Sequence, residues 1–263
     1  MNIQDFNYHT HTYRCGHANG TDEDYVLAAI EAGYKILGFS DHAPYRDLPF
    51  PRSRMAWEQL DEYVESINAL KEKYKDQIEI HVGLETEYYP DHHDEKVALL
   101  EKVEYLLLGQ HSMYPTGDGS FFRFNTDEQL MMYAENICKG LEAGLYTYLC
   151  HPDVYIYNQV GFDDTCRKVA RMILAKAAET DTPVEINVHG VNRGRQHFPD
   201  GSEQYWYPHK EFWKIAAEYP LRCIYGIDAH DPQRLLDLEK VAEAQKELED
   251  LGMTFIKEPL VFR

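Results

Sequence analysis

Short apolar runs alternate along the chain with longer segments in which apolar residues recur at helical spacing. Short runs between helical segments are typical of buried strands. The strands predicted in this way are Phe6–His9, Ile36–Ser40, Glu79–Glu85, Tyr105–Gln110, Thr147–His151, Val184–Val188 and Cys223–Asp228. This alternation predicts repeated βα units and therefore an α/β fold.

The segments between the strands carry signals for helix ends. Thr21 precedes Asp22–Asp24, which places a capping hydroxyl and acidic residues at a helix start, and Gly33 follows the same helix. Pro232 opens the last helix, which ends before Gly252. The remaining predicted helices are Met55–Tyr74, Asp94–Val103, Thr126–Ala143, Asp163–Thr180 and Lys210–Glu218. The chain therefore contains seven predicted βα units.

Metal-binding side chains follow six of the seven predicted strands. These strand ends read His9-Thr10-His11, Asp41-His42, Glu85, Gln110-His111, His151-Pro152-Asp153 and Asp228-Ala229-His230. One strand-end histidine alone is ordinarily a hydrogen-bonded core or loop residue, but the whole set argues for a shared site. An open sheet would spread these ends along a line, whereas a barrel gathers them around one mouth. The predicted fold is a distorted (β/α)7 barrel that forms a single domain over residues 1–263.

The chemistry of this set favours a cluster of metal ions. Imidazoles and carboxylates without thiolates suit zinc, iron or manganese, and such ligands can be shared between ions. His9 and His11 alternate along an extended strand, so both rings lie on one side and can bind one ion.

Composition limits the classes of function. A chain of 263 residues with 44% hydrophobic content can bury the core of one domain. The formal net charge of −19 disfavours a nucleic-acid partner, because phosphates are bound through Lys and Arg. An anionic substrate would need a strongly positive local site inside the fold.

The cysteines and the N-terminal residues predict a cytoplasmic protein without a membrane partner. The five cysteines include no C-x-x-C pair, so we expect reduced thiols, with Cys15 and Cys150 as small buried residues. The sequence has no apolar stretch of about 18 residues. Its first residues also lack the basic segment and apolar run of a secretory signal.

Several motifs, taken together in chain order, resemble those of the polymerase-and-histidinol-phosphatase (PHP) superfamily, and specifically its monofunctional histidinol-phosphatase branch. They are Tyr8-His9-Thr10-His11 with Gly16-His17, Phe39-Ser40-Asp41-His42, Gly83-Leu84-Glu85, Gln110-His111-Ser112, Cys150-His151-Pro152-Asp153 and Gly226-Ile227-Asp228-Ala229-His230. The resemblance covers essentially the whole chain. It implies a phosphomonoesterase that hydrolyses L-histidinol phosphate to L-histidinol and phosphate in histidine biosynthesis, with a small phosphorylated substrate as its partner.

The resemblance also implies about three divalent ions, of Zn, Mn or Fe, and assigns their ligands. One ion would be held by His9, His11, Glu85 and Asp228, a second by Glu85, His111 and His151, and a third by His17, His42 and His230. Glu85 would bridge the first two ions, which gives Glu85 and Asp228 catalytic roles. The ions would offset the acidic charge and activate water for attack on phosphorus.

Two further roles stay open in the sequence. The leaving alkoxide could receive a proton from Asp41, from Asp153 or from water on the third ion, whereas both carboxylates could instead orient His42 and neighbouring loops. Arg193 and Arg195 follow the sixth strand and could bind phosphate, although a solvated loop is the alternative. Beyond these, Arg14 is a weaker phosphate candidate, and His189 could contact a substrate ring.

Other functions remain alternatives. Another PHP phosphoesterase would act on a different small organic phosphate. A metal-dependent amidohydrolase could use the same barrel, but such sites often contain a carbamylated lysine, and no predicted strand ends in lysine. A non-catalytic metal-binding domain would more naturally have lost ligands. The sequence fixes neither the physiological metal nor the oligomeric state.

Overall fold

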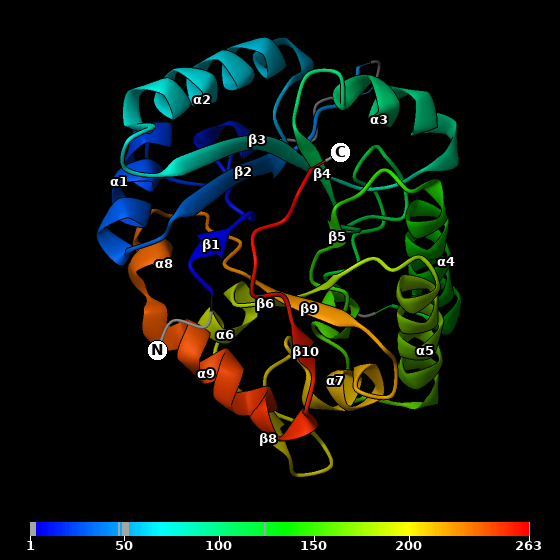
Figure 1. Cartoon of the computed structure of the whole chain (residues 1–263). Coiled ribbons are helices and arrows are strands. Elements are labelled where there is room, and N and C mark those ends of the chain that lie inside the picture. The colour runs from blue at the N-terminus through cyan, green and yellow to red at the C-terminus, as the bar shows by residue number, and fades with distance from the viewer. Residues whose placement is uncertain (1–3, 47, 49–52, 124, 263) are drawn as a thin grey trace.

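The computed structural model describes residues 4–46, 48, 53–123 and 125–262. Its main element is a curled parallel sheet of eight strands in the order β1-β2-β3-β4-β5-β6-β9-β10 (Figure 1). The strands are β1 Phe6–Asn7, β2 Ile36–His42, β3 Glu79–Thr86, β4 Tyr105–Leu108, β5 Tyr148–Leu149, β6 Val184–Asn187, β9 Arg222–Gly226 and β10 Thr254–Phe255. The seven predicted strands correspond to β1–β6 and β9.

The sheet closes at one end only. Thr10 forms a parallel bridge with Ala229, and the His11 amide donates to the Ala229 carbonyl at 2.9 Å, so the continuations of β1 and β9 meet. At the opposite end of β9, Arg222 pairs with Thr254 of β10 instead. On one side, β9 is therefore flanked by the continuation of β1 near its carboxyl end and by β10 near its amino end, which distorts the barrel. The predicted distorted α/β barrel is confirmed. Strand β10 was not predicted, because two residues carry no readable alternation.

Helices cover the outside of the sheet (Figure 1). They are α1 Asp22–Ala32, α2 Leu60–Tyr74, α3 His93–Leu99, α4 Asp127–Ala143, α5 Asp164–Glu179, α6 His189–Asn192, α7 Lys210–Ala216, α8 Gln233–Leu236 and α9 Leu238–Leu248. Single 3-10 turns are η1 Tyr13–Cys15, η2 Trp57–Gln59, η3 Pro90–His92, η4 Val154–Ile156 and η5 Glu249–Leu251. Among the described residues, no helix is both long enough and apolar enough to cross a bilayer.

Several helix ends follow the sequence signals, whereas α2 begins at Leu60 rather than Met55 and α3 ends at Leu99 rather than Val103. Thr21 and Asp24 form a capping box at α1, and Gly33 ends the helix at φ 85°. The predicted last helix is instead divided into α8 and α9, because Asp237 has a non-helical ψ of 61°. A short antiparallel pair, β7 Gln196–His197 with β8 Glu203–Gln204, was also not predicted.

A cluster of buried, mostly apolar side chains fills the barrel interior toward the amino-terminal ends of the strands. It consists of Phe6, Tyr8, Ile36, Tyr105, Leu107, Tyr148, Cys150 and Ile224. The Tyr105 ring occupies space left by glycine, since a Cβ atom on Gly83 would lie 2.3 Å from Tyr105 Cζ. Phe262 stacks on Tyr105 with centroids 4.6 Å apart and covers the base. The predicted metal ligands lie at the other end, where the strands end at their carboxyl termini.

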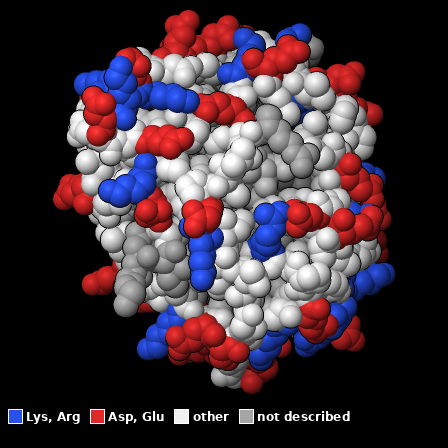
Figure 2. Space-filling view, in the orientation of Figure 1, with Lys and Arg blue, Asp and Glu red and all other residues white. Residues whose placement is uncertain are grey.

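The surface charge is dispersed rather than gathered. Figure 2 shows acidic side chains spread over this face of the molecule with Lys and Arg side chains between them. The excess of acidic residues, a formal net charge of −19, therefore acts as a diffuse field.

Candidate metal centre and substrate pocket

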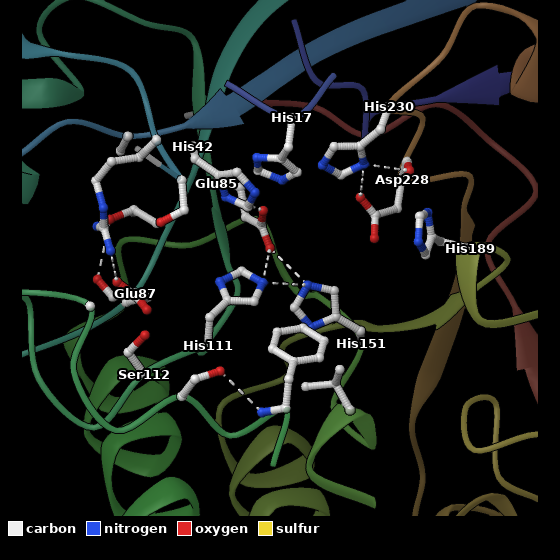
Figure 3. Close-up of a pocket in the computed structure, with 18 of the residues that line it drawn as sticks. His17, His42, Glu85, Glu87, His111, Ser112, His151, His189, Asp228 and His230 are labelled. Atoms are coloured by element: carbon white, nitrogen blue, oxygen red, sulfur yellow. Dashed lines mark hydrogen bonds and ion pairs between the residues drawn. The ribbon is translucent and has the colours of Figure 1, made fainter. Parts of the chain in front are cut away.

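A pocket of about 450 Å³ lies at the mouth of the barrel. Its floor and walls include seven of the nine predicted metal ligands, which point toward one another in Figure 3. These seven are His17, His42, Glu85, His111, His151, Asp228 and His230. The other two, His9 and His11, are completely buried beneath them. The chain thus brings all nine residues into one cluster.

The first group joins β1 to the end of β9. Nε2 of His9 lies 3.1 Å from Nε2 of His11, and His11 Nε2 lies 3.1 Å from Oδ1 of Asp228. His9 Nε2 is 3.6 Å from Oε2 of Glu85. Four potential ligand atoms therefore converge on one point, as alternation along β1 predicts for the two histidines.

Glu85 connects this group to its neighbours. Its Oε1 lies 2.8 Å from Nε2 of His151 and 3.4 Å from Nε2 of His111. Its Oε2 lies 2.9 Å from Nδ1 of His42. A Cβ atom on Gly109 would fall 1.9 Å from Oε1, so only glycine leaves room for this carboxylate. Glu85 occupies the centre of the cluster.

The third group consists of His17, His42 and His230, whose potential ligand atoms lie within 4.8 Å of one another. The rings of His17 and His230 stack with centroids 4.6 Å apart. His17 is the exposed member of the group and follows η1. Cys15 also lies near His11 and His230, but burial raises the pKa of its thiol, which opposes thiolate binding.

Backbone strain marks two of the candidate ligands. His151 has φ 27° and Asp228 has φ 53°, in the left-handed region that side chains other than glycine rarely adopt. Each residue lies two positions beyond the end of its strand, β5 at Leu149 and β9 at Gly226, so the chain turns sharply where it presents a ligand. Strain of this kind concentrates at functional sites.

Two buried residues of β6 support the first group and escaped the sequence analysis. Oε2 of Glu185 lies 2.7 Å from Nδ1 of His9. The Asn187 amide donates to Oε1 of Glu185 at 2.7 Å and to Oδ2 of Asp228 at 3.1 Å. Both face the barrel interior, as alternate residues of one strand do. Polar residues at i and i+2 of a buried strand were the available signal.

Asp41 and Asp153 lie outside the pocket lining. Asp41 accepts hydrogen bonds from the Thr12 hydroxyl and from the His42 amide, the latter at 2.8 Å, and lies 3.5 Å from His11 Nδ1. Asp153 accepts from the His209 amide at 2.8 Å and from the Trp213 indole at 3.0 Å. Burial raises the pKa of Asp153 to about 7. Their surroundings favour the orienting role left open by the sequence.

The two candidate phosphate-binding arginines differ in position. Arg193 lines the pocket, where its Nε donates to the Tyr207 hydroxyl at 3.2 Å and its Nη1 to the Tyr157 hydroxyl at 3.3 Å. Arg195 does not line the pocket and pairs with Glu247. Of the weaker candidates, His189 lines the pocket, whereas Arg14 is held by Asp22 at 2.8 Å and by Glu62 at 2.8 Å.

The electrostatics of the cluster leave its carboxylates ionised. Burial raises the pKa of Glu85, but His111, His42 and His9 outweigh it and hold that pKa well below its usual range. Burial lowers the pKa of His111 and of His230 well below the usual value, which keeps both rings neutral. Burial lowers the pKa of His9 and of His11, but the neighbouring carboxylates outweigh it and raise both pKa values. These rings must therefore release a proton when metal binds, because neutral imidazole and ionised carboxylate are the forms that bind metal.

The arrangement fits divalent cations on structural grounds. The facing Nε2 atoms of His9 and His11 can share only one proton, and His230 Nε2 is buried without a hydrogen-bond partner among the described residues. A cation accepts lone pairs from all such atoms at once. The donor set of imidazole and carboxylate is that of a zinc, manganese or iron site.

Comparison with known proteins gives the family. Residues 7–189 match the model of the PHP domain. The chain belongs to the PHP domain family. The resemblance to this superfamily seen in the sequence motifs is therefore confirmed.

Relatives of the PHP chain carry one recurring name. This chain is 28% identical over 257 residues to a "Probable histidinol-phosphatase" of Deinococcus radiodurans, and the match covers 93% of this chain and 92% of that protein. It is also 31% identical over 145 residues to a histidinol-phosphatase of Bacillus subtilis, covering 51% and 53% of the two chains.

Solved structures share the fold. The histidinol phosphate phosphatase of Lactococcus lactis, crystallised with zinc, L-histidinol and phosphate, matches with a TM-score of 0.73 at 19% identity over 95% of each chain. A protein of Listeria monocytogenes matches with a TM-score of 0.69 at 23% identity, covering 87% of this chain and 96% of that one. At these identities the likeness supports the distorted barrel of the PHP chain.

Proposed function

We propose that this protein is a metal-dependent phosphomonoesterase that hydrolyses L-histidinol phosphate to L-histidinol and phosphate in histidine biosynthesis. The observation that carries the proposal is the convergence of nine metal-binding side chains, the seven histidines with Glu85 and Asp228, at the floor of one 450 Å³ pocket. The chain-long similarity to a protein named as a histidinol-phosphatase supports the choice of substrate.

The nine side chains would hold about three divalent ions, of Zn, Mn or Fe. His9, His11, Glu85 and Asp228 form one ligand set, Glu85, His111 and His151 a second, and His17, His42 and His230 a third. When bound, such ions supply positive charge for phosphate oxygens and lower the pKa of water toward 7 for attack on phosphorus.

The protein's own contribution is to fix these ligands before substrate arrives. Glu185 holds the Nδ1 side of His9, which leaves Nε2 facing the cluster. Asn187 ties Glu185 to Asp228, so both carboxylates are held by one amide. Such supporting contacts are commonly worth 10- to 100-fold in metal affinity or activity, as a rough guide. We assign Asp41 and Asp153 to the same supporting role.

Arg193 and His189 form the wall from which a substrate phosphate would be contacted. Arg193 is already oriented by Tyr207 and Tyr157, so little freedom is lost when its guanidinium meets phosphate. The Nδ1 atom of His189 is buried without a partner among the described residues and can serve a bound ligand. We leave Arg195 out of this role because it pairs with Glu247 away from the pocket.

Phosphate release from a panel of esters tests the proposal. The panel contains L-histidinol phosphate, simple sugar and amino-alcohol phosphates and phosphodiesters, each with added manganese, zinc or iron. We expect the highest kcat/KM for L-histidinol phosphate, since that ratio measures discrimination. Turnover of another phosphomonoester at least about tenfold more efficiently would reject the substrate and keep the reaction class. Hydrolysis of diesters alone would reject both.

A further inference from the structure

Arg14 is a buried cation in η1, the turn just after His11. Its Nη1 and Nη2 donate to the two carboxylate oxygens of Asp22 at 2.8 and 2.9 Å, and its Nε and Nη2 donate to those of Glu62, both at 2.8 Å. The remaining N–H group, on Nη1, donates to the Thr12 hydroxyl at 3.2 Å. The guanidinium fork is thereby fully used, and the residue is only 3% exposed.

Only part of this network joins helices. Asp22 begins α1 and Glu62 lies in the first turn of α2, so the two ion pairs hold these helices to η1. The bond to Thr12 instead leads toward the metal ligands, because Thr12 directly follows His11 in the chain. A brace between the two helices would not need this bond.

The Thr12 hydroxyl has one direction left for its hydrogen. Its oxygen accepts from Nη1 of Arg14, so its hydrogen cannot point back at the guanidinium and is donated to Oδ2 of Asp41. Thr12 and Asp41 are both completely buried, so bulk water does not compete for either group. Arg14 therefore sets the direction of a hydrogen bond that ends at Asp41.

The Asp41 carboxylate passes this orientation on to a metal ligand. With Oδ2 held by Thr12, its Oδ1 accepts from the His42 amide at 2.8 Å and lies 3.5 Å from Nδ1 of His11. That nitrogen is buried and has no hydrogen-bond partner among the described residues. When Nε2 of His11 binds an ion, the ring proton stays on Nδ1, and a carboxylate beside it fixes the tautomer and the ring orientation.

We propose that Arg14 is a positioning residue for the first group of candidate ligands. Through the Thr12 hydroxyl it orients the Asp41 carboxylate, and this carboxylate orients the His11 ring for an ion. Arg14 thus serves the metal centre without contacting metal or phosphate. The inference rests on the metal centre of the proposed function and does not depend on the substrate.

Zinc binding by the metal-free protein tests the link at Thr12. Thr12→Val keeps the shape of the side chain and removes the hydroxyl. We expect it to bind one of its zinc ions roughly 10- to 100-fold more weakly, the range for lost supporting contacts. Thr12→Ser keeps the hydroxyl and should bind zinc like the wild type. Ser66→Ala is the matched control, because it removes a 2.6 Å hydrogen bond to Asp22 but leaves the link untouched, and it should not change zinc affinity.

Arg14→Lys tests the other end of the link. Lysine keeps the positive charge beside Asp22 and Glu62, but its donors all lie on one nitrogen and cannot reproduce the fork. We expect a loss of zinc affinity like that of Thr12→Val. The double variant should lose no more affinity than the single variants, because both changes break one link and their effects are then not additive.

Calorimetric titration with zinc measures these affinities without turnover, and thermal unfolding followed by circular dichroism shows that each variant is folded. A role limited to bracing helices would lower the unfolding temperature and leave zinc affinity unchanged. Wild-type zinc affinity in Thr12→Val or in Arg14→Lys, or losses that multiply in the double variant, would overturn the inference and leave the metal centre standing. Absence of zinc binding by the wild type would overturn both.

Discussion

Nε2 of His9 lies 3.1 Å from Nε2 of His11, and both rings are completely buried. The opposite nitrogen of His9 is held by Glu185 at 2.7 Å, and that of His11 lies 3.5 Å from Asp41. Each ring therefore turns its Nε2 atom toward the same point. An ion that binds there meets ligands that are already oriented, so the fold itself supplies part of the metal affinity.

Replacing the central carboxylate tests the cluster most simply. Glu85→Gln keeps the size of the side chain but removes the charge that lies between His151, His111 and His42. We expect loss of phosphatase activity and of two of the about three ions, with the fold retained. Elemental analysis and circular dichroism on the same sample measure both. Near-normal turnover and metal content would mean that Glu85 is structural.

The third ion can be tested through an exposed ligand. His17→Ala removes a ring that lies at the surface, so it leaves no buried cavity. We expect the bound metal to fall by about one ion of three and kcat/KM to fall by roughly 10- to 100-fold or more. His197→Ala, an exposed histidine on β7, is the matched control and should change neither quantity. Unaltered metal content in His17→Ala would contradict a third site.

The two arginines after β6 give a paired test of phosphate binding. Arg193→Ala should cost about 1.5–3 kcal/mol in kcat/KM, the range for a charge-assisted bond to phosphate. Arg195→Ala should cost much less, because Arg195 pairs with Glu247 outside the pocket. Steady-state kinetics on both variants decide this. Equal losses in kcat/KM, or a larger loss for Arg195→Ala, would show that Arg193 is not the residue that binds the phosphate.

Lys96 gives a pH dependence of stability. Burial lowers the pKa of this lysine to about 7, although its Nζ lies 3.5 Å from Glu95. Between about pH 7 and 10 the unfolded chain binds a proton that the folded chain does not, so stability rises with pH across this window. Lys96→Met should be more stable than wild type near pH 7 and lack this rise. Urea unfolding at pH 7 and pH 9 measures the free energy of unfolding of both proteins. An equal rise of this free energy with pH in wild type and Lys96→Met would contradict the lowered pKa of Lys96.

Much of the site was predictable because its ligands are tied to local periodicity. Strand ends in a barrel meet at one mouth, so His9, Glu85 and His151 could be expected together although they are far apart in the chain. Alternation also placed His9 beside His11. These relations depend on strand order and period, which a sequence displays directly.

The remaining features depend on packing that a pattern does not display. Arg193 and Arg195 are two residues apart, yet only the loop path directs Arg193 to Tyr207 and Arg195 to Glu247. Glu185 of β6 reaches His9 because β9, the neighbour of β6, meets the continuation of β1 through Thr10 and Ala229. Such long-range neighbours follow from the closed fold.

Reconstitution of the metal-free protein tests the central claim most directly. Manganese or zinc is added stepwise while phosphate release from L-histidinol phosphate is followed. The account predicts no activity without metal and a rise that levels off at about three equivalents, as expected for the three ligand sets. Full activity in the metal-free protein, or no phosphate release at any metal content, would contradict it.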